Sequence, residues 1–208
     1  MKRCKQALSI LLVSCMILAY LPTTVFAINY SGYCGNNTGG LIQYDLDTET
    51  KTIILDGNGG GMYDYYDRYS RPKRNAPWYP YREEIMFAEI KSVNNIGGHA
   101  FEDCSNLVGI TISKSVKRIG SGAFENCSSL ESIVIPENVT SIGEYAFSRC
   151  TALTNINIPS SISTIKKCTF WGCSNLDSVI IPSSVTSVSP SAFSRCEKLV
   201  TAGPIGGK

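Results

Sequence analysis

Hydrophobic positions in the second half of the chain recur every 23 residues. Four full copies cover residues 96–118, 119–141, 142–164 and 165–187, and a fifth begins at Val188. Phased copies at a fixed period of this length are typical of solenoids, in which each unit covers the apolar face of its neighbour. The pattern therefore predicts a stacked repeat solenoid over residues 85–203.

Each unit is predicted to hold one short strand and one return turn. In the second copy, Ile133 and Ile135 alternate with polar residues, and Pro136 ends the strand because proline donates no ladder hydrogen bond. The pair Ala123 and Phe124 is predicted to begin a helical or 3-10 turn on the opposite side. Units stacked at about 4.8 Å, the spacing of paired strands, would bury one continuous core.

The motif IGxxAFxxCxxLxxIxIPxxVxx, carried by residues 119–141, resembles the BspA-like (Treponema pallidum type) leucine-rich repeat family. The resemblance implies a leucine-rich-repeat solenoid, with short parallel strands on one face and turns or short helical segments on the other. The resemblance also implies a role in adhesion, because members of this family adhere to host or matrix proteins and to other cells.

Two copies depart from the motif. Ser113 replaces the strand-ending proline of the first copy, and Lys166, Cys168 and Thr169 replace the Gly, Tyr and Ala of the third copy in the fourth. These changes predict local irregularity within the same fold.

Residues 28–84 do not share the period and are predicted to cap the first coil. Residues 41–57 alternate on both sides of a polar turn near residues 47–50, which predicts a β-hairpin. An aromatic and proline-rich stretch follows. Secreted proteins that resemble this one often begin with an SGxCG segment and carry an APWY segment, here residues 31–35 and 76–79.

Residues 1–27 are predicted to be a signal peptide that is cleaved after Ala27. A basic start, an apolar run over residues 7–21 and small residues before the cleavage point form the usual export pattern. A lipoprotein box at residues 12–15 is the alternative, but the residues after Cys15 stay apolar, whereas a lipoprotein usually turns polar there. The expected location is secreted or cell-surface.

The C-terminal end breaks off within the pattern. The fifth copy lacks its IxIP strand, and residues 204–208 form a truncated tail. Further repeats or domains are therefore expected after Lys208.

Charge and histidine content restrict the function classes. The net charge is +2, and the basic excess lies within the predicted leader, so the mature chain is near neutral. This argues against nucleic-acid binding driven by charge. The one histidine, His99, occupies a variable turn position with no nucleophile assigned to it. We therefore predict no catalytic, cofactor-binding or metal-binding residues, no enzyme activity and no cofactor.

The 23-residue period also places cysteines in a ladder. Its members are Cys104, Cys127, Cys150, Cys173 and Cys196. A linear file cannot bring four ligands to one zinc ion, and neighbouring side chains that point the same way disfavour disulfides. Buried free thiols are predicted, with an occasional disulfide as the alternative. Cys168 lies off the ladder and is predicted to be exposed.

Two surfaces are candidates for binding. Outward positions of the strands form two columns, and the candidate binding face comprises Ser132, Val134, Asn155, Asn157, Ser178 and Ile180. The aromatic stretch is favoured as cover for the first coil, with Trp78 as the plug and Tyr65 or Tyr66 exposed. The alternative is that Tyr65, Tyr66 and Trp78 form a stacking platform for sugars.

The sequence therefore predicts a secreted or cell-surface binding module that contacts an extracellular protein or glycan. The favoured interpretation is adhesion, in which the strand face binds a protein. A non-catalytic glycan-binding module and a passive spacer of a longer surface protein are the alternatives. No nucleic-acid partner and no stable transmembrane segment are expected.

Overall fold

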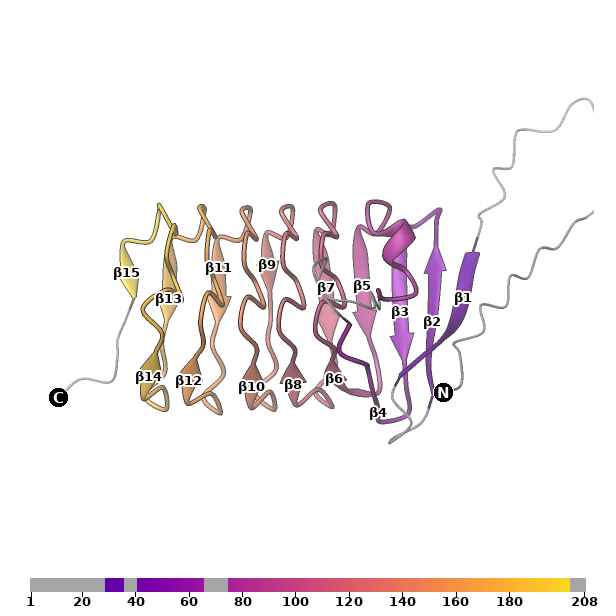
Figure 1. Cartoon of the computed structure of the whole chain (residues 1–208), viewed down its shortest axis with the longest axis horizontal. Coiled ribbons are helices and arrows are strands. Elements are labelled where there is room, and N and C mark those ends of the chain that lie inside the picture. The colour runs from indigo at the N-terminus through magenta and orange to yellow at the C-terminus, as the bar shows by residue number, and fades with distance from the viewer. Residues whose placement is uncertain (1–28, 36–40, 66–74, 203–208) are drawn as a thin grey trace, which may run out of the picture.

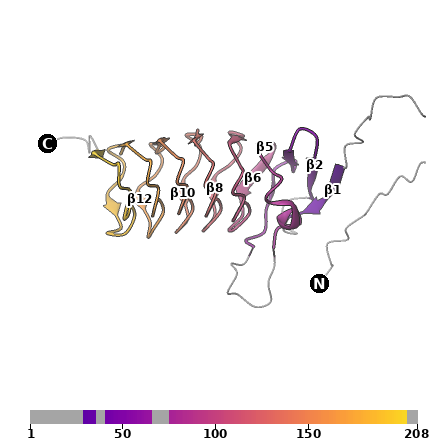
Figure 2. The same cartoon turned by 90° about the horizontal axis from the view of Figure 1, so that it is seen from above.

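A computed structural model describes residues 29–35, 41–65 and 75–202. The predicted signal peptide, the lipoprotein box and the tail at residues 204–208 lie outside the described residues. The coils stack along one long axis, from the N-terminal strands to the last coil (Figure 1). A view turned by 90° shows the same single row of coils (Figure 2). The predicted solenoid is confirmed.

Each coil contributes one strand to each of two rows. The N-terminal elements are β1 (Asn29–Cys34), β2 (Ile42–Asp47), β3 (Thr52–Asp56), β4 (Gly60–Gly61) and the 3-10 helix η1 (Tyr79–Tyr81). The first row of the array contains β5 (Phe87–Ile90), β7 (Gly109–Ile112), β9 (Ser132–Ile133), β11 (Asn155–Asn157), β13 (Ser178–Ile180) and β15 (Thr201–Ala202). The second row contains β6 (Val93–Ile96), β8 (Arg118–Ile119), β10 (Ser141–Ile142), β12 (Thr164–Ile165) and β14 (Ser187–Val188).

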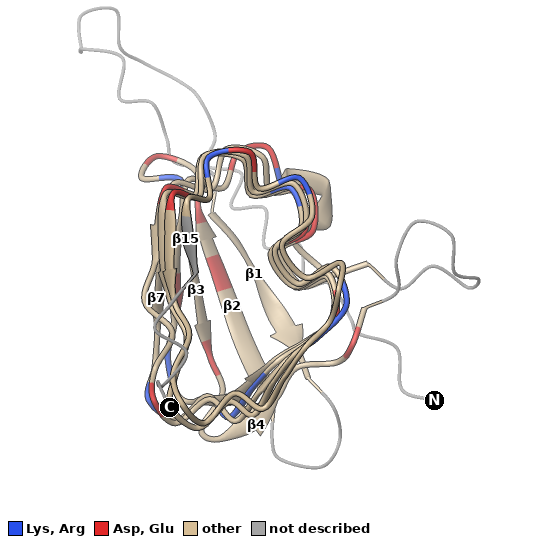
Figure 3. Ribbon diagram, turned by 90° about the vertical axis from the view of Figure 1, so that its left-hand side faces the viewer, with Lys and Arg blue, Asp and Glu red and all other residues tan. Residues whose placement is uncertain are grey.

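The strand register equals the sequence repeat. In β11, Asn155 pairs in parallel with Ser132 on one side and with Ser178 on the other. Each residue therefore lies beside its equivalent in the next coil. Viewed along the long axis, the coils superimpose on one outline, and most charged positions lie on loops (Figure 3).

The N-terminal hairpin joins the array's sheet directly. Strands β2 and β3 pair antiparallel with Tyr44 opposite Leu55, which confirms the hairpin predicted over residues 41–57. Strand β3 then runs parallel to β5, with Ile53 opposite Ala88. Strand β1 adds an antiparallel outer strand to β2 that the sequence pattern does not predict.

Trp78 closes the apolar end of the first coil. Its side chain is fully buried, and its Nε1–H donates a hydrogen bond to the carbonyl oxygen of Ala100 at 2.8 Å. The indole packs against the ring of Phe101, with centroids 5.8 Å apart, and meets Tyr44 and Tyr65 edge-on. The prediction of Trp78 as the plug is confirmed.

The prediction that Tyr65 is exposed is wrong. Its side chain is 3% exposed, because it packs edge-on against Trp78 with a ring-centroid distance of 5.9 Å. Two aromatic rings, and not one, are therefore used to cover the first coil. Tyr66 lies outside the described residues.

A file of stacked phenylalanines runs through the core behind the plug. Its members are Phe101, Phe124, Phe147, Phe170 and Phe193, and successive ring centroids lie 5.4, 5.4, 5.6 and 5.2 Å apart. The first four rings are fully buried. Because consecutive rings are nearly parallel, each coil presents a flat apolar surface that only the next coil covers.

The predicted helical turn at Ala123 and Phe124 is instead an irregular turn. The N–H of Phe124 donates to the carbonyl of Ala146 in the next coil, at 2.8 Å. A left-handed residue follows at Asn126, with φ of 62°. Since alternate N–H groups on this side donate to the next coil, the local hydrogen bonds that remain do not form a continuous helix. The 3-10 helix η1 is the one helix among the described residues.

Both predicted irregularities occur. Strand β7 extends over four residues, and Ser113, where later copies have proline, donates its N–H to Ile90 at 2.9 Å. In the second row, β10 and β12 belong to different sheets. A Cβ at Gly143 would overlap the backbone of the preceding coil. Lys166 carries a Cβ at the equivalent position of the next copy, so close pairing of the strands is interrupted there.

The stacking predicts a position-dependent cost of removing phenylalanine rings. Phe147→Ala is expected to lower the free energy of unfolding by roughly 3–5 kcal/mol, because it removes a buried ring that stacks on Phe124 and on Phe170. Phe87→Ala, at a side chain 45% exposed, is the matched control and is expected to cost no more than about 1 kcal/mol. Urea unfolding followed by circular dichroism measures both. Equal losses would contradict the stacked core.

Candidate binding surfaces

The strand face presents the two predicted columns of side chains. Ser132, Asn155 and Ser178 lie exposed in one column. In the other column, Val134 is 75% and Ile180 is 68% exposed. The face is thus a flat row of small polar groups beside exposed apolar ones.

Asn157, one of the predicted binding residues, is bonded within the solenoid. Its side-chain oxygen accepts the N–H of Ile135 at 2.9 Å, and its side-chain nitrogen donates to the carbonyl of Ile135 at 2.8 Å. The side-chain amide of Asn157 thus bonds both backbone groups of Ile135, at the point where the pairing between the strands of the two coils ends. Asn157 therefore has a structural role that the sequence reasoning did not predict.

A groove of about 660 Å³ runs along the turns of successive coils. Most of its lining is polar, including the hydroxyl-bearing residues Ser105, Ser128, Thr151 and Ser174 at 23-residue intervals. Arg149, Trp171 and Arg195 also line it. The sequence reasoning missed these three residues, because they come from different units and the pattern of one unit does not show that they line the same groove.

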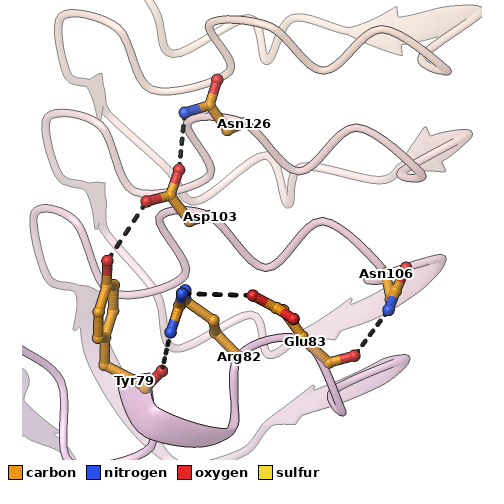
Figure 4. Close-up of polar contacts among 6 residues, drawn as sticks. All are labelled: Tyr79, Arg82, Glu83, Asp103, Asn106 and Asn126. Carbon is orange, nitrogen blue, oxygen red and sulfur yellow. Dashed lines mark hydrogen bonds and ion pairs between the residues drawn. The ribbon is translucent and has the colours of Figure 1, made fainter.

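At the N-terminal end of this groove, the polar side chains are linked to one another by hydrogen bonds and an ion pair (Figure 4). Asp103 accepts hydrogen bonds from Tyr79 at 3.4 Å and from Asn126 at 2.7 Å. Arg82 pairs with Glu83 at 3.3 Å, and the carbonyl of Glu83 accepts the side-chain N–H of Asn106 at 2.7 Å. The bonds of Tyr79 and Glu83 fasten η1 to the copy at residues 96–118, and Asn126 links that copy to the next one.

A second groove, of about 600 Å³, contains His99. The residue adopts a left-handed turn, with φ of 56°, which agrees with its predicted turn position. Its Nδ1 lies 3.3 Å from Oε2 of Glu102, whose side chain is only 7% exposed. Gly122 makes room for the imidazole, since a Cβ there would overlap the ring.

His99, Glu102 and Glu125 are the residues that could hold a metal ion, because their ligand atoms lie within 4.8 Å of one another. The sequence reasoning considered metal sites built from several histidines or from the cysteine ladder, and it missed this cluster. Its signal was present, since Glu125 follows Glu102 by one 23-residue period. Cys168 lines the same groove three coils away, about 14 Å along the stack, which is too far for a Cys–His catalytic pair.

The cysteine ladder forms one inner file. The thiols of Cys127, Cys150, Cys173 and Cys196 each donate to the carbonyl of the phenylalanine 26 residues earlier, at 3.1–3.2 Å. All seven cysteines of the described residues are free, as predicted. Burial raises the pKa of the ladder thiols, so they remain protonated at neutral pH.

The prediction that Cys168 is exposed is wrong. It is 8% exposed and has a left-handed φ of 53° at the turn position equivalent to His99. Its short side chain lies in the second groove, whose lining also includes the larger side chains of Tyr145 and Trp171.

With this geometry established, comparison with known proteins identifies the family. The BspA type leucine rich repeat region matches six copies over residues 81–200. The chain belongs to this family. The match begins at residue 81, ahead of the first of the five predicted units, and therefore includes the coil that holds β5 (Phe87–Ile90). BspA-type repeats thus account for the whole array.

Solved structures share the BspA-type fold. A leucine-rich repeat protein from Eubacterium ventriosum is 24% identical, with a TM-score of 0.61, over 81% of this chain and 42% of that one. The T. pallidum leucine rich repeat protein is 25% identical, with a TM-score of 0.52, over 76% and 87%. A leucine rich cell surface protein from Faecalibacterium prausnitzii is 25% identical, with a TM-score of 0.50, over 82% and 54%.

This BspA-type chain therefore spans less than half of the Eubacterium protein. No curated protein matches it. Within the part of the chain that the structure describes, no helix has the length and hydropathy needed to cross a membrane.

The thiol geometry predicts an order of chemical reactivity. Cys196 is half-buried, whereas Cys150 is fully buried beneath its neighbours. Brief maleimide labelling of the native protein at pH 7.5, read by peptide mass spectrometry, is expected to modify Cys196 well before Cys150, because only an accessible thiolate reacts. Denaturation in urea should abolish the difference. Equal native labelling of the two thiols would contradict the buried file.

Proposed function

We propose that this BspA-type repeat protein is a secreted or cell-surface binding module that contacts an extracellular protein through its strand face, as in adhesion. The observation that carries the proposal is the pair of in-register columns on β9, β11 and β13. They offer a flat contact surface held by backbone pairing. A rigid face of this kind loses little conformational freedom when a partner binds.

The chemistry of the columns favours a protein partner. Val134 and Ile180 are large apolar side chains exposed beside the small polar side chains of Ser132, Asn155 and Ser178. Burial of exposed apolar side chains at the centre of a polar surface is the usual source of protein–protein affinity. The face offers no group for proton transfer, which supports a non-catalytic role.

Export to the surface is supported by two observations. The first 27 residues have the pattern of a signal peptide. A relative of the same fold, from Faecalibacterium prausnitzii, is described as a cell surface protein. That protein is nearly twice as long as the segment matched here, so its further regions are not carried over to this chain.

The aromatic stretch no longer supports a glycan platform. Trp78 and Tyr65 are buried in the cap, where they cannot stack on a sugar. The remaining alternative is a passive spacer. It is favoured by the 42% coverage of the longer Eubacterium protein.

The proposal predicts loss of binding when charge is placed on the strand face. Val134→Glu combined with Ile180→Glu is expected to weaken binding at least about tenfold, because two carboxylates would be desolvated in the contact. The measurement is binding of the full chain to an array of purified extracellular matrix proteins, followed by titration of each array protein bound.

The matched control carries the same two charges on the other strand row, as Thr164→Glu with Ser187→Glu, which are paired and exposed positions. This control is expected to bind as the unchanged protein does. Binding that survives the strand-face change would contradict the proposal, and an array with no bound protein would favour the spacer.

A further inference from the structure

Two arginines flank one tryptophan in the groove of about 660 Å³. Arg149 and Arg195 occupy equivalent positions two coils apart, and Trp171 belongs to the coil between them. The guanidinium carbons lie 5.0 Å and 4.9 Å from the centroid of the indole ring. The indole therefore holds two cationic groups at one place in the groove, by cation–π attraction.

The position between the two arginines carries no side chain. It is Gly172, and the equivalent residues of the other coils are Asp103, Asn126, Arg149 and Arg195. All five have φ between 60° and 72°. Since the other coils hold this backbone conformation with a side chain, the turn does not require glycine at this point.

The glycine instead leaves this row open for the indole. A Cβ at Gly172 would meet nothing closer than Cγ of Arg149, at 3.6 Å, which is ordinary contact distance. With coils about 4.8 Å apart, the backbones of Arg149 and Arg195 are separated by roughly 10 Å. Because Trp171 belongs to the coil between them, its indole lies between the two guanidinium groups. An anionic group would therefore contact both arginines at the solvent-facing N–H edges of their guanidinium groups, across the open position of Gly172.

Neither arginine is neutralised by the described part of the chain. Arg82 and Arg118 form ion pairs with Glu83 and Asp64, at 3.3 Å and 2.8 Å. By contrast, Arg149 and Arg195 make no ion pair with a described residue and are exposed. Cation–π contact leaves the in-plane N–H donors of a guanidinium available for a carboxylate or sulfate.

The acidic residues of the same groove lie mainly at its other end. Asp103 is held by Tyr79 and Asn126 in the network of Figure 4, and Glu83 pairs with Arg82. Glu197 is the acidic side chain that follows Arg195 in the last coil. Within this groove, the positive charge is therefore concentrated around Gly172. Arg149 also lines the second groove, which contains Glu102, Glu125 and Glu144.

We propose that Arg149, Gly172 and Arg195, supported by Trp171, form a clamp for the carboxylate or sulfate group of an acidic polysaccharide. This binding site lies on the turn side and is separate from the strand face. A polysaccharide is favoured over a peptide because the groove offers a hydroxyl group on each of four successive coils, and Trp171 is its one large apolar side chain. A polymer with regularly spaced hydroxyls fits such a row.

The experiment titrates the full chain, at physiological salt, with four probes by isothermal calorimetry. Heparin carries sulfate and carboxylate, polygalacturonate carries carboxylate alone, dextran sulfate carries sulfate alone, and neutral dextran carries neither. Binding to one or more of the three anionic probes but not to dextran is expected. The pattern among the anionic probes distinguishes a carboxylate ligand from a sulfate ligand.

Variants locate the site. Arg149→Gln and Arg195→Gln are each expected to weaken binding about tenfold, the usual cost of one charge-assisted contact. Gly172→Asp is expected to weaken it further by placing a carboxylate between the arginines. Gly172→Asn, of nearly equal size, should weaken it less. Lys117→Gln, an exposed lysine outside the groove, removes the same charge and should bind unchanged.

Unchanged thermal melting of the variants keeps the comparison interpretable, and the left-handed Asp103 and Asn126 show that both replacements at position 172 suit the turn. Binding that the arginine variants leave intact would overturn the clamp. Binding of polyglutamate in place of every anionic polysaccharide would overturn the assignment to carbohydrate. Failure of the clamp would leave the strand-face proposal untouched, since its variants lie on the other side.

Discussion

Each coil of this protein leaves one apolar surface that only the next coil can cover, and the rest of the structure follows from this constraint. The phenylalanine rings stack at 5.2–5.6 Å, and a cysteine thiol bonds to the phenylalanine carbonyl of the coil before. Dispersion and burial favour this stacking, and the backbone N–H groups of the turns add hydrogen bonds between coils. Trp78 provides at the first coil the ring that a preceding unit would otherwise supply.

The sequence predicted the main repeating features that depend on the 23-residue period. The period fixes which residues become neighbours, so the strand columns, the cysteine file and the break near Lys166 could be deduced before any coordinates. The hairpin of β2 and β3 was equally predictable, because its alternation is local.

Features set by packing outside the period could not be predicted in this way. Tyr65 and Cys168 were assigned to the surface, but Tyr65 packs edge-on against Trp78, and Cys168 is buried in a groove that several coils form. The helical turn failed because its N–H groups are used between coils, a competition that a single unit does not reveal. The arginine pair required knowing that equivalent turn residues share one left-handed conformation and one groove.

The two long sides of the solenoid differ in chemistry. The strand side is mostly uncharged, whereas the turn side carries most of the charged residues, two grooves and the His99 cluster (Figure 3). Both sides inherit the same spacing between coils. A rigid framework with two unlike surfaces allows two contacts of different kinds on one module, without any moving part.

The central claim is that whole coils are the interchangeable units of stability. The most direct measurement compares the unfolding of two insertion variants by urea titration. A second copy of residues 119–141, placed after Ser141, preserves every coil-to-coil contact and is expected to give a cooperative protein at least as stable as the original. Insertion of residues 119–130 alone shifts the register by half a coil and is expected to destabilise the protein severely. Equal tolerance of both insertions, or equal damage by both, would contradict the account.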